Sequence, residues 1–274
     1  MDALQAIVLG IVQGLTEFLP ISSTGHLRIV PAFFGWEDPG AAFTAVTQLG
    51  TMLAILIYFR QDLLRIVVAT LKSVRTDRWH SRDIDAKIGW YIIIGTIPIG
   101  IFGLAFKSVI EDGARSLYVI GIALILFSAV ILRAEAAGQQ ERDIKDITAR
   151  DGLLIGVFQA IALIPGVSRS GATISGGLFL GFRREDAARY SFLLSIPAVV
   201  LSGLLELKDI GDHTHANAGA VPTAIATILA FAVGYATIEF LLRFVARNSI
   251  AVFCGYRAAV GALVLLLAGT NVIS

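Results

Sequence analysis

Long apolar stretches alternate with short polar segments along the whole chain. Six of these stretches carry few charges, and they cover residues 41–59, 88–106, 117–132, 187–207, 219–244 and 250–268. A helix needs about 20 predominantly apolar residues to cross the hydrocarbon core of a bilayer. The six stretches are therefore predicted to be transmembrane helices, the third being the shortest at 16 residues.

Two further apolar regions, 3–35 and 152–182, are each interrupted near the middle. The interruption falls at Pro20 in the first region and at Pro165 and Gly166 in the second. Proline breaks a helix because it lacks the backbone donor and clashes with the preceding turn, and glycine weakens it. We therefore predict that each region forms a re-entrant pair of helices, which enters and leaves the membrane on the same side.

Composition agrees with a membrane setting. Hydrophobic residues make up 56% of the 274 residues, charged residues make up 16%, and the mean hydropathy is +0.77. These values are too apolar for a soluble domain of this length. The expected fold is an all-α polytopic membrane protein with six transmembrane helices and two re-entrant helix hairpins. Its single cysteine, Cys254, leaves no basis for a disulfide framework.

Lys and Arg residues are unevenly shared between the connecting segments. Segment 60–87 holds seven and segment 133–150 holds four, whereas 107–116 and 208–218 hold two and one. Cytoplasmic loops close to membrane helices carry the excess of Lys and Arg, so the rich segments are expected in the cytoplasm. The first hairpin then enters from outside and the second from inside. The two halves are therefore predicted to form an inverted-topology repeat, as in many transporters.

The expected organisation is a single integral membrane domain over 1–274. The first repeat covers 1–132 and the second covers 151–268, each with one hairpin followed by three spans. Segments Gly10–Gly25 and Gly156–Gly171 support this division, because four of their sixteen aligned positions are identical. Interrupted apolar segments at matching positions point to a binding site where the two turns meet. The identical pairs are Gly10 and Gly156, Gln13 and Gln159, Ser22 and Ser168, and Gly25 and Gly171.

Each predicted hairpin carries one charged residue near its turn, Glu17 in the first and Arg169 in the second. Charged side chains at membrane depth are costly and usually mark function. Hydroxyl groups ahead of a helix cap its N-terminus, which attracts anions, and a guanidinium matches phosphate oxygens. An anionic, phosphate-like ligand suits this cluster. Its other polar members are Gln13, Ser22, Ser23, Thr24, His26, Ser168, Ser170 and Thr173.

Simpler interpretations exist for the same residues. The hydroxyl groups serve equally well as plain helix caps. His26 is compatible with a structural role, and Glu17 with Arg169 is compatible with a structural ion pair that joins the hairpins. Arg257 lies inside the last apolar stretch, where it needs a partner such as Glu17 or a backbone carbonyl. Gln48, in the first stretch, either reaches the site or bonds to a neighbouring helix.

The two motifs resemble a known family. Gln13-Gly-Leu-Thr-Glu17-Phe-Leu-Pro-Ile-Ser-Ser-Thr-Gly-His26 and Pro165-Gly-Val-Ser-Arg-Ser-Gly-Ala-Thr173 are similar to the signature motifs of the undecaprenyl-diphosphate phosphatases, the bacitracin-resistance protein family. The resemblance covers nearly the whole chain. It implies a multi-pass hydrolase of the bacterial plasma membrane that converts undecaprenyl diphosphate to undecaprenyl phosphate and inorganic phosphate. This activity recycles the lipid carrier for peptidoglycan and other envelope polymers, and bacitracin sequesters its substrate.

The resemblance also implies a divalent cation, Mg²⁺ or Ca²⁺. Glu17 and Gln13 are the expected metal ligands, although Gln13 departs from the family form in which a second glutamate stands there. The expected catalytic residues are Glu17, Ser23, His26 and Arg169, with Ser23 as the nucleophile and His26 handling its proton. Direct attack by water is the alternative. The expected substrate-binding residues are Ser22, Thr24, Ser168, Ser170, Thr173, Arg257 and Gln48, Arg257 because it resembles a family position thought to contact phosphate.

The expected partners are the polyprenyl diphosphate substrate and the membrane lipids, with a homodimer left open and no nucleic acid. Because the first hairpin enters from outside, the active site is expected to open to the external face. The repeat also suits a different class of protein, a lipid flippase or anion transporter with its binding site at the midplane. Ser23 and His26 separate the two classes, because a carrier needs no nucleophile with a proton partner.

Overall fold

The computed structural model describes residues 1–75, 83–106, 116–210 and 219–273. Within these ranges the chain is helical and forms no β-strand beyond an isolated bridge between Arg142 and Phe182. The helices are α1 (Ala3–Phe18), α2 (Ser23–Phe34), α3 (Gly40–Tyr58), α4 (Arg60–Arg75), α5 (Ile84–Ala105), α6 (Leu117–Ala137), the short 3-10 turn η2 (Ile144–Asp146), α7 (Ala149–Ile161), α8 (Arg169–Phe179), α9 (Arg184–Ile210), α10 (Ala220–Val245) and α11 (Val252–Gly269).

Each of the six apolar stretches coincides with one helix, namely α3, α5, α6, α9, α10 and α11. Four of these, α5, α6, α10 and α11, are long and apolar enough to cross a membrane within the described residues. Large apolar side chains such as Leu126 and Ile228 lie on the outer surface. Such a surface is stable in lipid and not in water. The chain is therefore a multi-pass helical membrane protein, as the hydropathy predicts.

The basic segment 60–87 differs from its expected form. It is a helix from Arg60 to Arg75, which follows α3 after a break at Phe59. Its apolar positions recur at helical spacing, and the acidic Asp62 stabilises the N-terminal turn. Counting charges used neither of these two helix signals. Residues 76–82 of this segment, and most of the charge-poor segments 107–116 and 208–218, lie outside the described residues, and the last residues of the segment begin α5.

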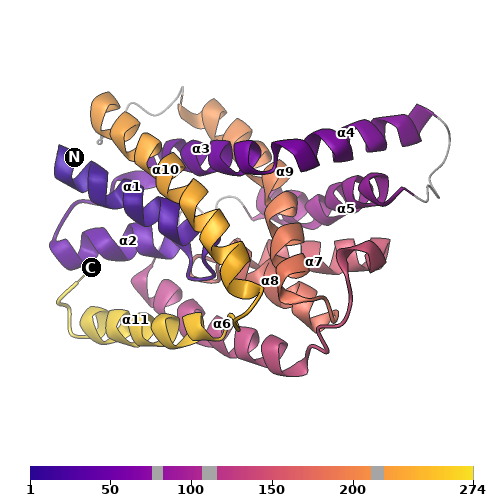
Figure 1. The fold of residues 1–274 in the computed structure, drawn as a ribbon. Coiled ribbons are helices and arrows are strands. Elements are labelled where there is room, and N and C mark those ends of the chain that lie inside the picture. The colour runs from indigo at the N-terminus through magenta and orange to yellow at the C-terminus, as the bar shows by residue number, and fades with distance from the viewer. Residues whose placement is uncertain (76–82, 107–115, 211–218, 274) are drawn as a thin grey trace.

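Both interrupted regions form helix hairpins, α1 with α2 and α7 with α8 (Figure 1). Each hairpin packs its first helix against a long helix of the other half of the chain, α1 against α10 and α7 against α5. Glycines permit this close approach. A Cβ atom on Gly156 would lie 2.2 Å from the carbonyl oxygen of Gly95, and one on Gly10 would lie 2.5 Å from that of Ala226. The two halves therefore interlock and do not pack as separate bundles.

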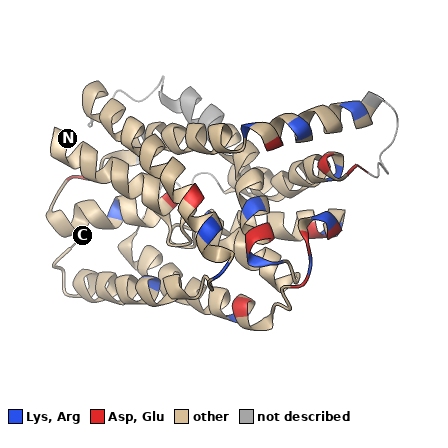
Figure 2. Cartoon of the chain, viewed as in Figure 1, with Lys and Arg blue, Asp and Glu red and all other residues tan. Residues whose placement is uncertain are grey.

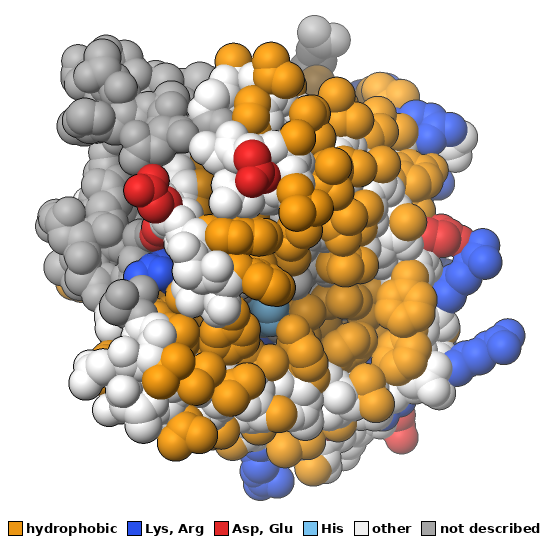
Figure 3. Space-filling model, turned by 90° about the vertical axis from the view of Figure 1, so that its left-hand side faces the viewer, with side chains coloured by type: hydrophobic (Ala, Val, Ile, Leu, Met, Phe, Trp, Pro, Cys, Tyr) orange, Lys and Arg blue, Asp and Glu red, His pale blue; other side chains and the backbone are white. Residues whose placement is uncertain are grey.

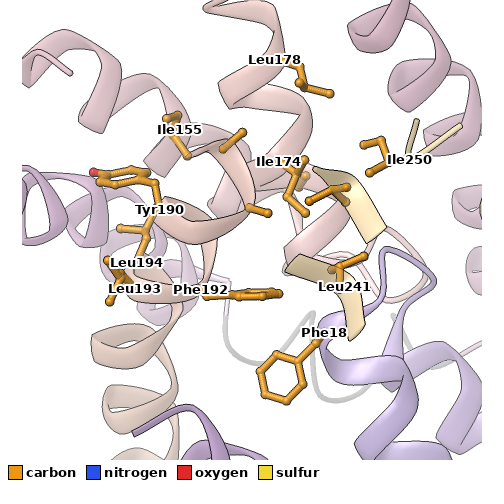
Figure 4. Packing of buried hydrophobic residues seen from close by; sticks show 14 of the residues in the cluster. Phe18, Ile155, Ile174, Leu178, Tyr190, Phe192, Leu193, Leu194, Leu241 and Ile250 are labelled. Atoms are coloured by element: carbon orange, nitrogen blue, oxygen red, sulfur yellow. The ribbon is translucent and has the colours of Figure 1, made fainter. Parts of the chain in front are cut away.

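The main apolar core surrounds α9 and the turn end of the first hairpin. Figure 4 shows Phe192 of α9 among side chains from α1, α8 and α10. Its ring meets the edge of Phe18, with centroids 5.4 Å apart. Because Phe18 follows Glu17 in the chain, this packing helps to hold the polar end of α1 in place. Charged residues gather toward the end of the molecule that carries α4, α5 and α7 (Figure 2).

Candidate active site

The turns of the two hairpins touch each other directly. The Gly166 N–H donates to the Ser22 hydroxyl oxygen over 3.2 Å, and the Ser170 hydroxyl donates to the Leu19 carbonyl over 3.0 Å. The polar residues of both motifs are thus brought to one place inside the protein. This is the meeting of the two turns that the internal repeat predicts.

Ser22 and Ser168 begin the second helix of each hairpin in nearly the same way. Their φ angles are 76° and 78°, in the left-handed region that residues other than glycine rarely adopt. Each serine caps its helix by accepting the N–H of Gly25 or Gly171, at 3.3 and 3.2 Å. Both α2 and α8 therefore begin at the junction, where their remaining N–H groups favour an anion.

Glu17 lies at the centre of the site and contacts four other predicted site residues. Its side chain is 6% exposed and forms an ion pair with Arg169, which is 19% exposed. Oε2 of Glu17 accepts the Ser23 hydroxyl over 2.7 Å and the Gln13 amide over 3.1 Å. Oε1 accepts the Gln48 amide over 3.3 Å. The structure therefore brings all five of these predicted site residues together, and Gln48 does reach the site.

The Gln13 amide has room for one more partner. Its Nε2 donates to Glu17, whereas its Oε1 is buried and has no hydrogen-bond partner. A buried acceptor without a donor costs free energy unless a ligand or water satisfies it. Among the described residues, no group of three or more His, Cys, Asp and Glu side chains is arranged to hold a metal. One carboxylate and one amide oxygen suit Mg²⁺ that keeps water or phosphate oxygens as its other ligands.

His26 has partners other than Ser23. Nδ1 of its ring lies 2.8 Å from the Ser22 carbonyl oxygen, and Nε2 lies 2.7 Å from the Tyr256 hydroxyl. The Ser23 hydroxyl donates to Glu17 instead. The expected pairing of Ser23 with His26 is thus not the arrangement in this structure. Their spacing of three residues does place them near each other on α2, but it does not decide which way either side chain turns.

Arg257 is fully buried and bonds to the backbone of both turns. Its guanidinium donates to the carbonyls of Pro20 at 2.8 Å, Gly166 at 3.0 Å and Val167 at 3.1 Å. Its Nε donates to the Ser128 hydroxyl at 3.3 Å. The sequence left Glu17 or a backbone carbonyl as the partner of Arg257, and the structure shows backbone carbonyls. The bonds commit most of the guanidinium's donors to the protein, in a position that joins the two turns.

The remaining predicted residues lie around this centre in different settings. Ser168 and Ser170 are buried at the start of α8, with their hydroxyl oxygens 3.1 Å apart. Thr24 is exposed beside Ser22, with 3.4 Å between the hydroxyl oxygens. Thr173 is completely buried and bonds to Ser191 of α9. Thr173 therefore links α8 to α9 through this hydrogen bond.

Comparison with known proteins identifies the family of the chain. The family model described as bacitracin resistance protein BacA matches residues 6–263. The chain belongs to the BacA family. Among curated relatives in this family, the undecaprenyl-diphosphatase of Thermobifida fusca is 52% identical over 274 residues, covering 100% of this chain and 93% of the relative. Undecaprenyl-diphosphatases of a Nocardioides species and of Mycolicibacterium smegmatis are 53% and 51% identical, each covering 100% of this chain and 99% of the relative.

Three residues at this BacA-family site were not found from sequence: Ser128, Ser191 and Tyr256. Ser128 and Ser191 are serines in apolar stretches of α6 and α9. Their contacts with Arg257 on α11 and with Thr173 on α8 depend on how these helices pack. Tyr256 stands next to Arg257, which was the available signal. Its contact with His26 spans 230 residues, so no local spacing predicts it.

Proposed function

We propose that this protein hydrolyses undecaprenyl diphosphate to undecaprenyl phosphate and inorganic phosphate. The observation that carries the proposal is the contact between Ser23, Glu17 and Arg169 at the junction of the two turns. A hydroxyl, a carboxylate and a guanidinium are the groups that phosphoryl transfer uses as nucleophile, base and charge stabiliser. Relatives about 50% identical over the full chain carry the name undecaprenyl-diphosphatase, which supports the same substrate. The activity would recycle the lipid carrier of envelope synthesis and confer bacitracin resistance.

In this mechanism Ser23 Oγ attacks the terminal phosphorus of the substrate. Glu17 takes the hydroxyl proton, because its Oε2 already accepts that hydrogen bond over 2.7 Å. The new Oγ–P bond forms as the bond from phosphorus to the bridging oxygen breaks, and lipid monophosphate leaves. Arg169, together with the N-termini of α2 and α8, stabilises the charge on the phosphate oxygens. Water then hydrolyses the phosphoserine. Direct attack by water on the diphosphate is the second route.

We further propose that the site takes Mg²⁺ or Ca²⁺ with the substrate. Glu17 and Gln13 would hold it, since the unpartnered Gln13 Oε1 is a suitable oxygen ligand. When bound, such a cation neutralises charge on the diphosphate. Ser22, Thr24, Ser168, Ser170 and Thr173 would complete the pocket as caps and supports of the two helix N-termini. Arg257 would contribute by holding the turns.

The proposed architecture is six transmembrane helices and two re-entrant hairpins in an inverted repeat, with residues 1–132 and 151–268 as its halves. The matching backbone angles of Ser22 and Ser168 and the reciprocal packing of the hairpins support it. The protein would lie in the bacterial plasma membrane with its site open to the external face, as the charge distribution predicts. The polyprenyl tail would remain in surrounding lipid. A homodimer stays a prediction, to be tested by mass measurement in detergent.

Phosphate release from undecaprenyl diphosphate by the purified protein in detergent tests this function. We expect release by the natural protein and its loss in Ser23→Ala and in Arg169→Ala. Ser195→Ala is the matched serine control, because that buried hydroxyl bonds to a carbonyl within its own helix, α9. Lipid that binds to the natural protein and is never hydrolysed would contradict the proposal and favour a flippase or anion transporter.

A further inference from the structure

Tyr256 connects the buried His26 ring to the surface of the protein. Its hydroxyl lies 2.7 Å from Nε2 of His26, and the two rings stack with centroids 5.6 Å apart. His26 is 5% exposed, whereas Tyr256 is 47% exposed. Figure 3 shows a histidine recessed among apolar side chains, and His26 is the histidine within the described residues. The half-exposed Tyr256 therefore holds the nearly buried His26 ring through a hydrogen bond and a stacking contact.

The backbone decides which nitrogen of neutral His26 carries the proton. Nδ1 lies 2.8 Å from the Ser22 carbonyl oxygen, and a carbonyl only accepts, so Nδ1 is the donor. Nε2 then accepts, and the Tyr256 O–H donates to it. If Nε2 gains a proton, it donates to the same phenol oxygen. Both protonation states of His26 therefore keep both hydrogen bonds, which is the arrangement that reversible proton transfer requires.

The charged groups near His26 have other partners. On α1, Glu17 pairs with Arg169 of α8 and accepts the Ser23 hydroxyl. On α11, Arg257 donates to the carbonyls of the two turns. On α2 itself, Arg28 pairs with Asp38, and α6 presents apolar Ile120 to the start of α2. The hydrogen-bond partner of His26 Nε2 is the uncharged Tyr256 hydroxyl.

We propose that Tyr256 is a further catalytic residue, which relays a proton between His26 and the water consumed in the reaction. The inference rests on the proposed hydrolysis. Because Glu17 receives the Ser23 proton, attack by water needs a second base. As the water oxygen bonds to phosphorus, the bond from phosphorus to Ser23 Oγ breaks, and Glu17 returns its proton to that oxygen. One proton of the water passes to the Tyr256 oxygen, and the phenol proton passes to Nε2 of His26. The phenol ends with one proton, as it began, and His26 stays imidazolium until it passes the extra proton back through the phenol to the departing phosphate.

Tyr256→Phe tests the relay, because it removes the hydroxyl and keeps the ring. We expect kcat for phosphate release to fall roughly 10- to 100-fold with KM within about twofold, and the pH dependence of kcat to change. In a His26→Asn background, Tyr256→Phe should not lower kcat any further, because the two residues act as one unit. Tyr118→Phe is the matched control. Tyr118 is 49% exposed, and its hydroxyl bonds to the Ala268 carbonyl at 3.0 Å.

A structural role would give a different result. An unchanged pH profile in Tyr256→Phe, or losses that multiply with His26→Asn, would overturn the relay. The hydrogen bond itself is tested without catalysis by ¹⁵N NMR of histidine-labelled protein, in which Tyr256→Phe should shift the Nε2 resonance of His26 and leave Nδ1 protonated. If the natural protein releases no phosphate, the proposed hydrolysis fails. The relay fails separately if that Nε2 resonance does not move.

Discussion

The Ser23 hydroxyl donates to Glu17 across the turn of the first hairpin, over 2.7 Å. The same carboxylate pairs with Arg169 of the second hairpin, so one side chain links Ser23 to Arg169. In the proposed mechanism this arrangement makes Glu17 the base for Ser23, and it leaves His26 for the proposed proton transfer through Tyr256.

Glu17→Gln should abolish most activity while leaving the protein folded. The amide keeps a hydrogen bond to Ser23 but cannot take its proton, so we expect kcat to fall by about 10² to 10⁴. Phosphate release and the melting temperature in detergent measure the two effects. Glu239→Gln is the matched control, since Glu239 also pairs with an arginine, Arg243, and accepts from Tyr58. A rate within a few-fold of the natural protein would exclude Glu17 as the base.

Arg257→Met should destabilise the protein more than it weakens substrate binding. It leaves three buried carbonyls without a donor, at about 1–3 kcal/mol each. We expect a large fall in melting temperature in detergent, and a smaller fall for Arg257→Lys, with little change in KM for the folded fraction. Arg133→Lys on the exposed side of α6 is the control. A raised KM at unchanged melting temperature would instead identify Arg257 as a phosphate ligand.

Removal of divalent cations by EDTA should stop phosphate release, and Mg²⁺ or Ca²⁺ should restore it. Gln13→Leu removes the unpartnered Oε1 and should raise the cation concentration needed for half-maximal rate, whereas Gln13→Glu should lower it by adding a carboxylate. Gln159→Leu is the matched control, because Gln159 is the equivalent buried glutamine of the second hairpin and its side chain has no hydrogen-bond partner. Equal cation dependence in all these variants would contradict a cation site at Gln13.

The ion pair of Arg142 and Asp151 should contribute stability that is lost in acid. Burial alone would raise the pKa of Asp151, but hydrogen bonds from Arg142 and Thr148 outweigh it and hold the pKa below its ordinary value. A carboxyl with a lowered folded pKa stabilises above its unfolded pKa, about 3.9, and the contribution disappears as pH falls through the folded value.

Asp151→Asn should therefore lower stability at pH 7 by about 1–3 kcal/mol, a modest range because Arg142 is partly exposed. The difference in stability between Asp151→Asn and the natural protein should become smaller in acid. Melting temperatures in detergent across pH measure it, with Glu141→Gln as an exposed control in the same connection. A difference that is independent of pH would show that the pair does not stabilise the fold through its charge.

Gly156→Ala should separate α7 from α5. The added Cβ would lie 2.2 Å from the Gly95 carbonyl oxygen, so the helix backbones must move apart. Overpacking of this kind costs about 1–3 kcal/mol. Gly100→Ala on α5 is the control, because nothing lies within 4 Å of that Cβ position and alanine favours a helix. Equal melting temperatures for the two variants would contradict the close packing.

Local patterns predict a large part of this protein. Hydropathy locates α3, α5, α6, α9, α10 and α11, and the prolines and glycine locate the two hairpin turns. The spacing of four residues correctly predicts that Gln13 and Glu17 meet on one face of α1. These features succeed because helix periodicity and helix breaking depend on neighbours within about one turn. The same patterns missed α4, because charge counting classified its residues as a connecting segment.

Contacts between distant segments were decided by tertiary structure. His26 bonds to Tyr256 rather than Ser23, and Arg257 bonds to the carbonyls of both turns. A residue type and its spacing state which groups are available for hydrogen bonding. The choice of partner depends on how α11 docks beside α2 and how the hairpins cross α5 and α10. That docking depends on glycine contacts and side-chain shape over the whole molecule, which no local pattern encodes.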